Sequence, residues 1–241
     1  MKWKSIVCGA ILSVALAAPA NAAPMGTFTI SDQASGVSVG LTFIDWDSDG
    51  PPSGTFEMGA GTNLTYTGGT LVATETGVVQ DITAVPIANF FTFDQDPLLS
   101  FDLAGLGPGS ANTDCANLAV GETCSPFVGS PFRLTLEATN ITSISLIGFG
   151  TATDGDGIST WQGLWTTQFT DREPVDIQSF FGCVEGDLVT DCDTFGQDLS
   201  IFNTYSGSFT ATVVPVPEPT MLALLGLGLL GAGARARRRR Q

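Results

Sequence analysis

Strict alternation of apolar and polar residues along several segments is the feature that most restricts the fold of this chain. In Val37–Phe43, every second residue is valine, leucine or phenylalanine, and serine, glycine and threonine lie between them. The same period of two runs through Trp161–Phe169 and Thr204–Val214. Because a strand sends alternate side chains to opposite faces, this pattern predicts antiparallel strands with one covered side and one solvent-facing side.

Short apolar segments between turn signals extend this pattern over most of the chain. Glycine, proline and aspartate mark turns, as in Asp49-Gly50-Pro51-Pro52 and Asp154-Gly155-Asp156-Gly157. The other segments expected to form strands are Thr27–Ser31, Gly54–Met58, Asn63–Thr67, Thr70–Thr74, Asn89–Phe93, Leu98–Leu103, Phe132–Leu136 and Ile141–Phe149. No run of ten or more residues in this region has helical period. We therefore predict an all-β fold, with a single antiparallel β-sandwich or jelly-roll-like domain over residues 23–214.

Charge is divided unequally along the chain. The sequence has 9 lysines and arginines against 24 aspartates and glutamates, and only Arg133 and Arg172 lie between residues 5 and 234. A body with so few cations cannot neutralise phosphates, so we expect no nucleic-acid partner. The chain has no histidine, which excludes Ser-His-Asp and Cys-His catalysis and histidine-bound metals.

The first 22 residues have the composition of a secretory signal peptide. Lys2 and Lys4 form a positive start, Ile6–Ala18 is a short apolar run, and Ala20-Asn21-Ala22 is a small-x-small cleavage signal. We predict that signal peptidase cleaves between Ala22 and Ala23, so that the body is exported.

The other end of the chain has three parts in a fixed order. Pro217-Glu218-Pro219 comes first, residues 221–234 form an apolar run, and arginines follow at positions Arg235, Arg237, Arg238, Arg239 and Arg240. Fourteen helical residues at ~1.5 Å each reach ~21 Å, which makes this predicted short transmembrane helix a marginal span of a ~30 Å hydrocarbon core. Arginine clusters stay on the cytoplasmic side of a membrane, so the body lies outside it.

These three parts resemble a PEP-CTERM sorting signal, over residues 215–241. The same segment is also known as the C-terminal domain of ice-binding proteins. The resemblance implies an exosortase as a partner, cleavage near Pro217-Glu218-Pro219, and only transient insertion in the inner membrane. It further implies that the processed protein lies at the cell surface or outside the cell, where extracellular polysaccharide is an expected partner.

Four cysteines remain after Cys8 leaves with the signal peptide: Cys115, Cys124, Cys183 and Cys192. An even number in an exported chain predicts disulfides, and four cysteines allow three pairings. Pairing Cys115 with Cys124 and Cys183 with Cys192 closes two short loops, each worth about 2.5–3 kcal/mol if unstrained. The alternative, a four-cysteine metal site, has no C-x-x-C spacing to support it.

An acidic loop is the main candidate for metal binding. Asp45, Asp47 and Asp49 alternate before Gly50 and would offer three oxygen ligands to Ca²⁺. The EF-hand pattern needs glutamate at position 56, which is phenylalanine here, so only a β-loop Ca²⁺ site is considered. Asp154-Gly155-Asp156 is a weaker candidate, and so are Asp187, Asp191 and Asp193. The competing interpretation is that these residues are ordinary turn formers on an acidic surface.

The composition leaves little catalytic chemistry, so we expect no enzyme. Paired carboxylates, as in glycoside hydrolysis, are the remaining option, but no pair of glutamates stands out. We expect Trp161, Trp165 and Phe169 to share an inward face, which leaves Trp46 as the best exposed aromatic residue for sugar stacking. Thr-x-Thr pairs occur at no fixed period, so an ice-binding array is not expected.

These observations favour a non-enzymatic, exported, exosortase-processed protein of the cell surface or extracellular matrix. Two alternatives remain: a Ca²⁺-assisted carbohydrate-binding module or adhesin, and a two-carboxylate glycan hydrolase.

Overall fold

The computed structural model describes residues 23–33, 36–40, 43–47, 53–181 and 201–213. The signal peptide, the sorting segment 215–241, Asp49, Cys183 and Cys192 lie outside these residues. The contacts of the chain group Asn21–Val214 into one compact unit.

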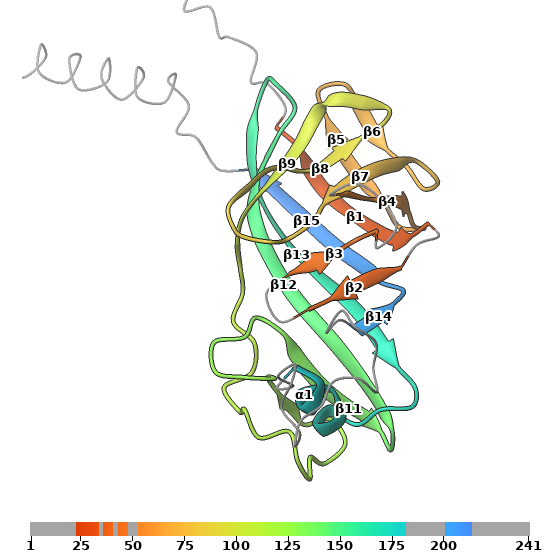
Figure 1. The fold of residues 1–241 in the computed structure, drawn as a ribbon. Helices are drawn as coiled ribbons and strands as arrows, with labels where there is room; N and C mark the ends of the chain where they lie inside the picture. The colour runs from red at the N-terminus through yellow and green to blue at the C-terminus, as the bar shows by residue number, and fades with distance from the viewer. Residues whose placement is uncertain (1–22, 34–35, 41–42, 48–52, 182–200, 214–241) are drawn as a thin grey trace, which may run out of the picture. The chain divides into compact units, whose positions relative to one another are not determined.

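Nearly all regular structure in the described part of the chain is antiparallel strand (Figure 1). The strands are β1 (Met25–Asp32), β2 (Val37–Val39), β3 (Ile44–Asp45), β4 (Ser53–Met58), β5 (Asn63–Tyr66), β6 (Gly69–Leu71), β7 (Thr76–Gln80), β8 (Ile87–Phe93), β9 (Asp96–Leu106), β10 (Thr123–Cys124), β11 (Arg133–Ala138), β12 (Ile141–Thr153), β13 (Ile158–Phe169), β14 (Ile201–Asn203) and β15 (Ser206–Val213). The prediction of an all-β, antiparallel fold is confirmed.

The main sheet closes on itself, which differs from the predicted sandwich of two packed sheets. Its strands follow the order β12-β13-β15-β1-β4-β7-β8-β9, and β9 pairs with β12 to complete a ring of eight. The edge of β12 is shared: Arg133–Ala138 pairs with its first part and β9 with its second. At this seam a Cβ on Gly150 would overlap the carbonyl oxygen of Asp102, so only glycine allows the two backbones to approach.

Aromatic side chains fill the inside of the closed sheet. Phe28 stacks on Phe209 with ring centroids 4.7 Å apart, and Phe101 meets Phe28 edge-on at 5.1 Å. Trp161 and Trp165 are buried beside them, as the period of two predicts, and Phe169 is partly buried. The inner face therefore has the edge-to-face and stacked geometries that favour aromatic pairs.

Two smaller parts adjoin the closed sheet. Strands β2, β3 and β14 form a three-stranded sheet, and β10 and β11 extend the main sheet beyond β12. Beside β11 lies α1 (Pro174–Phe181), a helix of 8 residues, which is shorter than the ten-residue runs considered in the sequence. Proline occupies its first position, and the Asp176 carboxylate accepts the Glu173 backbone N–H at 3.0 Å, which together start the helix.

The predicted helix over residues 221–234 lies outside the described residues. Within the described ranges, no helix has both the length and the apolar character needed to cross a membrane.

Candidate functional site

The acidic loop begins at the end of β3, where backbone donors hold its carboxylates. The Asp47 N–H donates to Oδ1 of Asp45 at 3.0 Å, and the Trp46 N–H donates to Oδ1 of Asp81 at 3.0 Å. Burial raises the pKa of Asp81; the bond from Trp46 opposes this, and the nearby charges of Asp45 and Asp47 add to it. Asp81 thus lies near the predicted Ca²⁺ ligands Asp45 and Asp47, which spacing in the sequence does not indicate.

The Ca²⁺ site itself stays a prediction. Asp49, the third predicted ligand, lies outside the described residues. Among the residues that the structure does describe, no three cysteine, aspartate or glutamate side chains are grouped so that they would hold a metal ion.

Asp154, in the weaker Ca²⁺ candidate, organises two turns instead. Its buried carboxylate accepts backbone N–H groups from Thr67 at 2.7 Å, Gly157 at 3.0 Å and Asp156 at 3.1 Å. Burial alone would raise the pKa of Asp154, but these bonds outweigh it and lower the pKa below its ordinary value. Both carboxylate oxygens are therefore engaged by the protein, and the turn-forming interpretation holds for this residue.

Trp46 is buried, contrary to the prediction from the sequence. It is 2% exposed rather than the best exposed aromatic residue, and its ring lies 4.8 Å from Tyr205 and 5.7 Å from Trp165. Its backbone N–H donates to Asp81, and because Ile44 two residues earlier is buried as well, Trp46 continues the inward-facing positions of β3. Its acidic neighbours in the sequence do not reveal this, so Trp46 offers no platform for sugar stacking.

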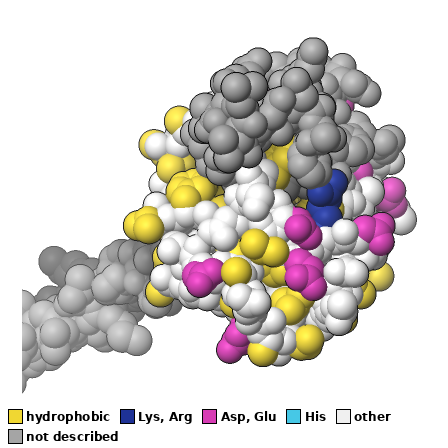
Figure 2. All heavy atoms as spheres, turned by 60° about the horizontal axis from the view of Figure 1, so that its bottom comes forward, with side chains coloured by type: hydrophobic (Ala, Val, Ile, Leu, Met, Phe, Trp, Pro, Cys, Tyr) yellow, Lys and Arg dark blue, Asp and Glu magenta, His cyan; other side chains and the backbone are white. Residues whose placement is uncertain are grey.

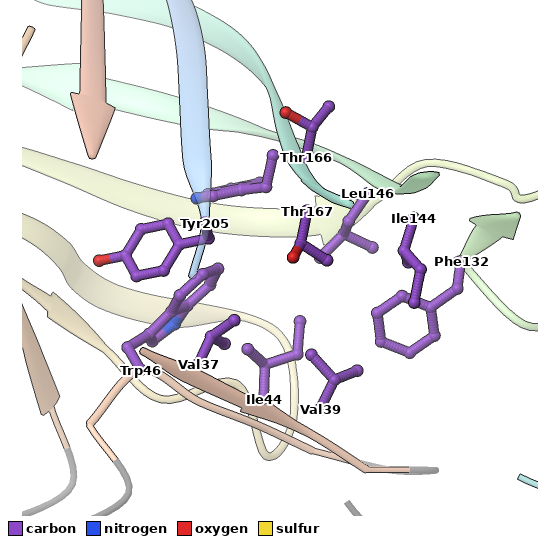
Figure 3. A pocket seen from close by; sticks show the side chains of 11 residues that line it. Val37, Val39, Ile44, Trp46, Phe132, Ile144, Leu146, Thr166, Thr167 and Tyr205 are labelled. Atoms are coloured by element: carbon purple, nitrogen blue, oxygen red, sulfur yellow. The ribbon is translucent and has the colours of Figure 1, made fainter. Parts of the chain in front are cut away.

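Trp46, Trp165 and Tyr205 line a small cavity between the three-stranded sheet and the main sheet (Figure 3). Aliphatic side chains from β2, β3 and β12 and the ring of Phe132 make the rest of the lining mostly apolar, and two threonines of β13 also contribute: Thr166 and Thr167. The two indole N–H groups and the Tyr205 hydroxyl have no hydrogen-bond partner among the described residues. Burial raises the pKa of Tyr205, and the charges of Asp32 and Asp47 raise it further.

The size of this cavity limits what it can hold. Its volume is ≈ 30 Å³. A buried water needs roughly 10–15 Å³ on this measure, so the space suits about two waters and no organic substrate. The cavity therefore does not define an active site.

The Cys115–Cys124 disulfide is present, with Cα atoms 5.3 Å apart. It closes a loop that α1 holds in place: the Gln178 amide donates to the carbonyl oxygens of Thr113 at 2.6 Å and Pro126 at 3.1 Å and accepts the Cys115 N–H at 3.2 Å. Since these two sulfurs are bonded to each other, they are not thiolate metal ligands. Cys183 and Cys192 lie outside the described residues.

Three of the glutamates available for carboxylate chemistry have local structural bonds. Glu75 accepts the Val72 N–H, Glu122 accepts the Ala119 N–H, and Glu137 accepts the Ser143 hydroxyl.

Figure 2, which brings the end with α1 and β11 forward, shows acidic and hydrophobic side chains interspersed there.

The outer surface of the closed sheet includes an uncharged region that no sequence motif marks. Strands β12, β13 and β15 contain no charged residue, although the chain carries 24 acids. Hydroxyl groups meet across these strands: Thr160 and Thr212 lie 3.3 Å apart, and Thr166 and Ser206 lie 3.1 Å apart. The signal was present in the sequence as an absence of Asp, Glu, Lys and Arg from three long segments.

The acidic, antiparallel β-sheet body and the basic tail together define a class, that of exported proteins with a C-terminal sorting signal. Residues 215–240 match the family model described as the PEP-CTERM protein-sorting motif. The tail is therefore a PEP-CTERM motif, which directs an exported protein to exosortase and to the cell surface. No curated protein and no solved structure matches the chain.

Proposed function

We propose that this is a non-enzymatic protein which exosortase processes near Pro217-Glu218-Pro219 and which then remains at the cell surface or in the extracellular matrix. The observation that carries the proposal is the PEP-CTERM motif at residues 215–240. The charge distribution supports it, because seven of the nine cations belong to the two terminal segments that processing removes.

The start of the body is consistent with cleavage before Ala23. Ala23 is 8% exposed and lies against Gly157, where an added Cβ would meet it. The Ser159 hydroxyl donates to the carbonyl oxygen of Pro24. The first residues after the predicted cut therefore belong to the packed body, which supports a mature chain that begins there.

Intact mass measurement of the processed protein tests the proposal. We expect a chain that starts at Ala23 and lacks the arginine cluster. When exosortase is deleted or Glu218→Ala is introduced, we expect the membrane fraction to hold protein that retains its C-terminal tail. Asp171→Ala, which removes one exposed carboxylate from the body, is the matched control and should be processed normally. A mature protein that still ends at Gln241 would refute the proposal.

A second candidate function is Ca²⁺-assisted carbohydrate binding. The observation that favours it is that Asp45 and Asp47 lie near enough to Asp81 for their charges to raise its pKa, so negative charge is concentrated in this region. If Ca²⁺ binds there, adding it at ~100 times its dissociation constant should stabilise the fold by about 2.7 kcal/mol, and Asp47→Asn should reduce the effect. Equal melting temperatures in EDTA and in millimolar Ca²⁺ would remove this candidate.

A further inference from the structure

We infer that the outer face of β12, β13, β15 and β1 binds a neutral polysaccharide chain. The inference rests on the proposed function, since an exported protein is exposed to extracellular polysaccharide. We call this surface the neutral face and define it by the exposed outward residues of these four strands: Met25, Thr27, Ser31, Phe149, Thr151, Ile158, Thr160, Gln162, Leu164, Gln168, Ser206, Ser208, Thr210 and Thr212.

The absence of charge on this face is specific to one part of the closed sheet. Strands β12, β13 and β15 contain 13, 12 and 8 residues with no charged side chain, and the charge on β1 is its last residue, Asp32. Carboxylates border this region on both sides: Glu57 in β4 is opposite Ser31, and Asp102 in β9, which also carries Asp96, is opposite Thr151. The neutral face is thus an uncharged surface on a body whose net charge would repel polyanions.

Strand register arranges these side chains in rows that cross the sheet. Thr151, Thr160 and Thr212 are direct neighbours in one row. In the next row, Phe149 is opposite Gln162, and Thr210 lies between Gln162 and Thr27. Neighbouring strands lie about 4.8 Å apart, so each row offers a series of evenly spaced polar groups.

The chemistry of the rows matches a polyhydroxylated partner. Serine and threonine hydroxyls and the glutamine amide both donate and accept hydrogen bonds, as sugar hydroxyls do. Phe149 is 45% exposed and Leu164 is 41% exposed, and they lie in adjacent rows. The outer end of the Phe149 ring rests over Gly105, which leaves apolar surface available to the C–H face of a pyranose.

A protein partner or a second copy of this chain fits the same face less well. Protein interfaces concentrate aromatic and aliphatic side chains at a dry centre and are depleted in serine. Here the exposed apolar residues are divided: Phe149 and Leu164 lie on one side of the row Thr151-Thr160-Thr212, and Ile158 lies on the other. The fourth, Met25, is on β1, two strands away from β13. Alternating apolar and hydroxyl surface is what a sugar chain itself presents.

Affinity electrophoresis of the mature protein tests the inference. The probes are hydroxyethylcellulose and dextran as neutral polymers and alginate as an anionic one, each embedded in a native gel. We expect one or both neutral glucans to retard the protein and alginate to have no effect. If neither neutral glucan retards the protein, the inference is overturned.

Matched variants locate the binding. Thr210→Glu places a carboxylate at the centre of the neutral face, and Thr55→Glu makes the same change at an exposed position of β4. We expect Thr210→Glu to weaken retardation at least tenfold and Thr55→Glu to change it less than twofold. If Thr210→Glu fails to fold, Gln162→Glu replaces it, because Gln162 is exposed in the same row.

Other outcomes overturn the inference without touching the proposed function. Equal losses of glucan retardation for Thr210→Glu and Thr55→Glu would show that an added charge weakens binding wherever it is placed. The neutral face would then not be the binding site. Sedimentation experiments test the alternative partner. If the protein self-associates, Thr210→Glu abolishes this association and no glucan retards the protein, the face binds a second copy of the chain. Processing by exosortase is read separately by mass, so failure of glucan binding and failure of the proposed function are distinguishable.

Discussion

The two halves of the closed sheet are alike inside and different outside. Phe28 and Phe209 in β1 and β15, and Phe56 and Phe101 in β4 and β9, are all buried in one aromatic core. On the outside, the strands of one half carry a single acid, Asp32 at the end of β1, and those of the other carry Glu57, Asp96 and Asp102. Since both halves pack the same kind of core, the core does not account for the missing charge on the neutral face, and we attribute it to the surface role proposed above.

The two halves also differ in how regularly their strands pair. β12 and β13 pair over twelve consecutive positions without a register shift, whereas β8 and β9 have two shifts. Bulges bend a strand and increase its local twist, so the neutral half keeps an even surface and the acidic half does not.

The largest expected effect tests whether the core is shared equally. Phe209→Ala in the neutral half and Phe56→Ala in the acidic half should each lower the free energy of unfolding by about 4 kcal/mol, because both rings are fully buried. Urea unfolding of both variants measures this. A loss at one site at least twice that at the other would contradict equal contributions from the two halves.

The Asp154 turn is the next strongest test, because it joins the β12–β13 connection to Thr67 after β5. Asp154→Ala leaves three backbone N–H groups without their acceptor, and we expect a loss of about 3 kcal/mol. The pKa of Asp154 is lowered in the folded state, so its contribution is present above the unfolded pKa and is lost as pH falls through the folded pKa. Unfolding of the wild-type protein and Asp154→Asn should therefore differ at neutral pH and converge in acid; a gap independent of pH would be the contrary result.

The disulfide loop lies outside both halves and provides a local reference. Replacing Cys115 and Cys124 together by serine should cost about 2.5–3 kcal/mol, because the unfolded chain regains the entropy of an open loop. We expect glucan retardation to be unchanged. If the double variant loses binding while its melting curve stays cooperative, the binding surface extends to the loop.

Much of the strand pattern was predictable, and the failures have local causes. β1, β4, β5, β8, β9, β11, β12, β13 and β15 lie where alternation and turn residues predict them. Val37–Phe43 was expected as one strand, but Gly40 donates its N–H to the carbonyl oxygen of Phe43 at 3.0 Å, and this turn divides β2 from β3. β7 was missed because only Val78 and Val79 among its five residues are large and apolar.

Closure of the sheet and the placement of site residues could not be read from the sequence. Pairing of β9 with β12 joins residues about fifty positions apart, and alternation says which face is covered but not which strand is adjacent. Trp46 looked exposed because its neighbours are acidic, whereas it is buried on the same side as Ile44, two residues earlier. The cysteine pairing was easier, because a short loop needs no long-range register.

The smallest expected effect is also the most direct test of the difference between the halves. Thr55→Glu and Thr210→Glu make the same change at exposed strand positions, and each should alter the free energy of unfolding by about 0.5 kcal/mol or less. At low ionic strength Thr55→Glu should be the more destabilising, because Glu57 lies two residues away on the same face, whereas the strands beside Thr210 carry no carboxylate at its row. Salt screens such repulsion with a Debye length of about 10 Å at 0.1 M and 3 Å at 1 M, so the difference in melting temperature should vanish in high salt. A larger or salt-independent loss for Thr210→Glu would mean that the hydroxyl rows stabilise the sheet, and the neutral face would then be explained by folding alone.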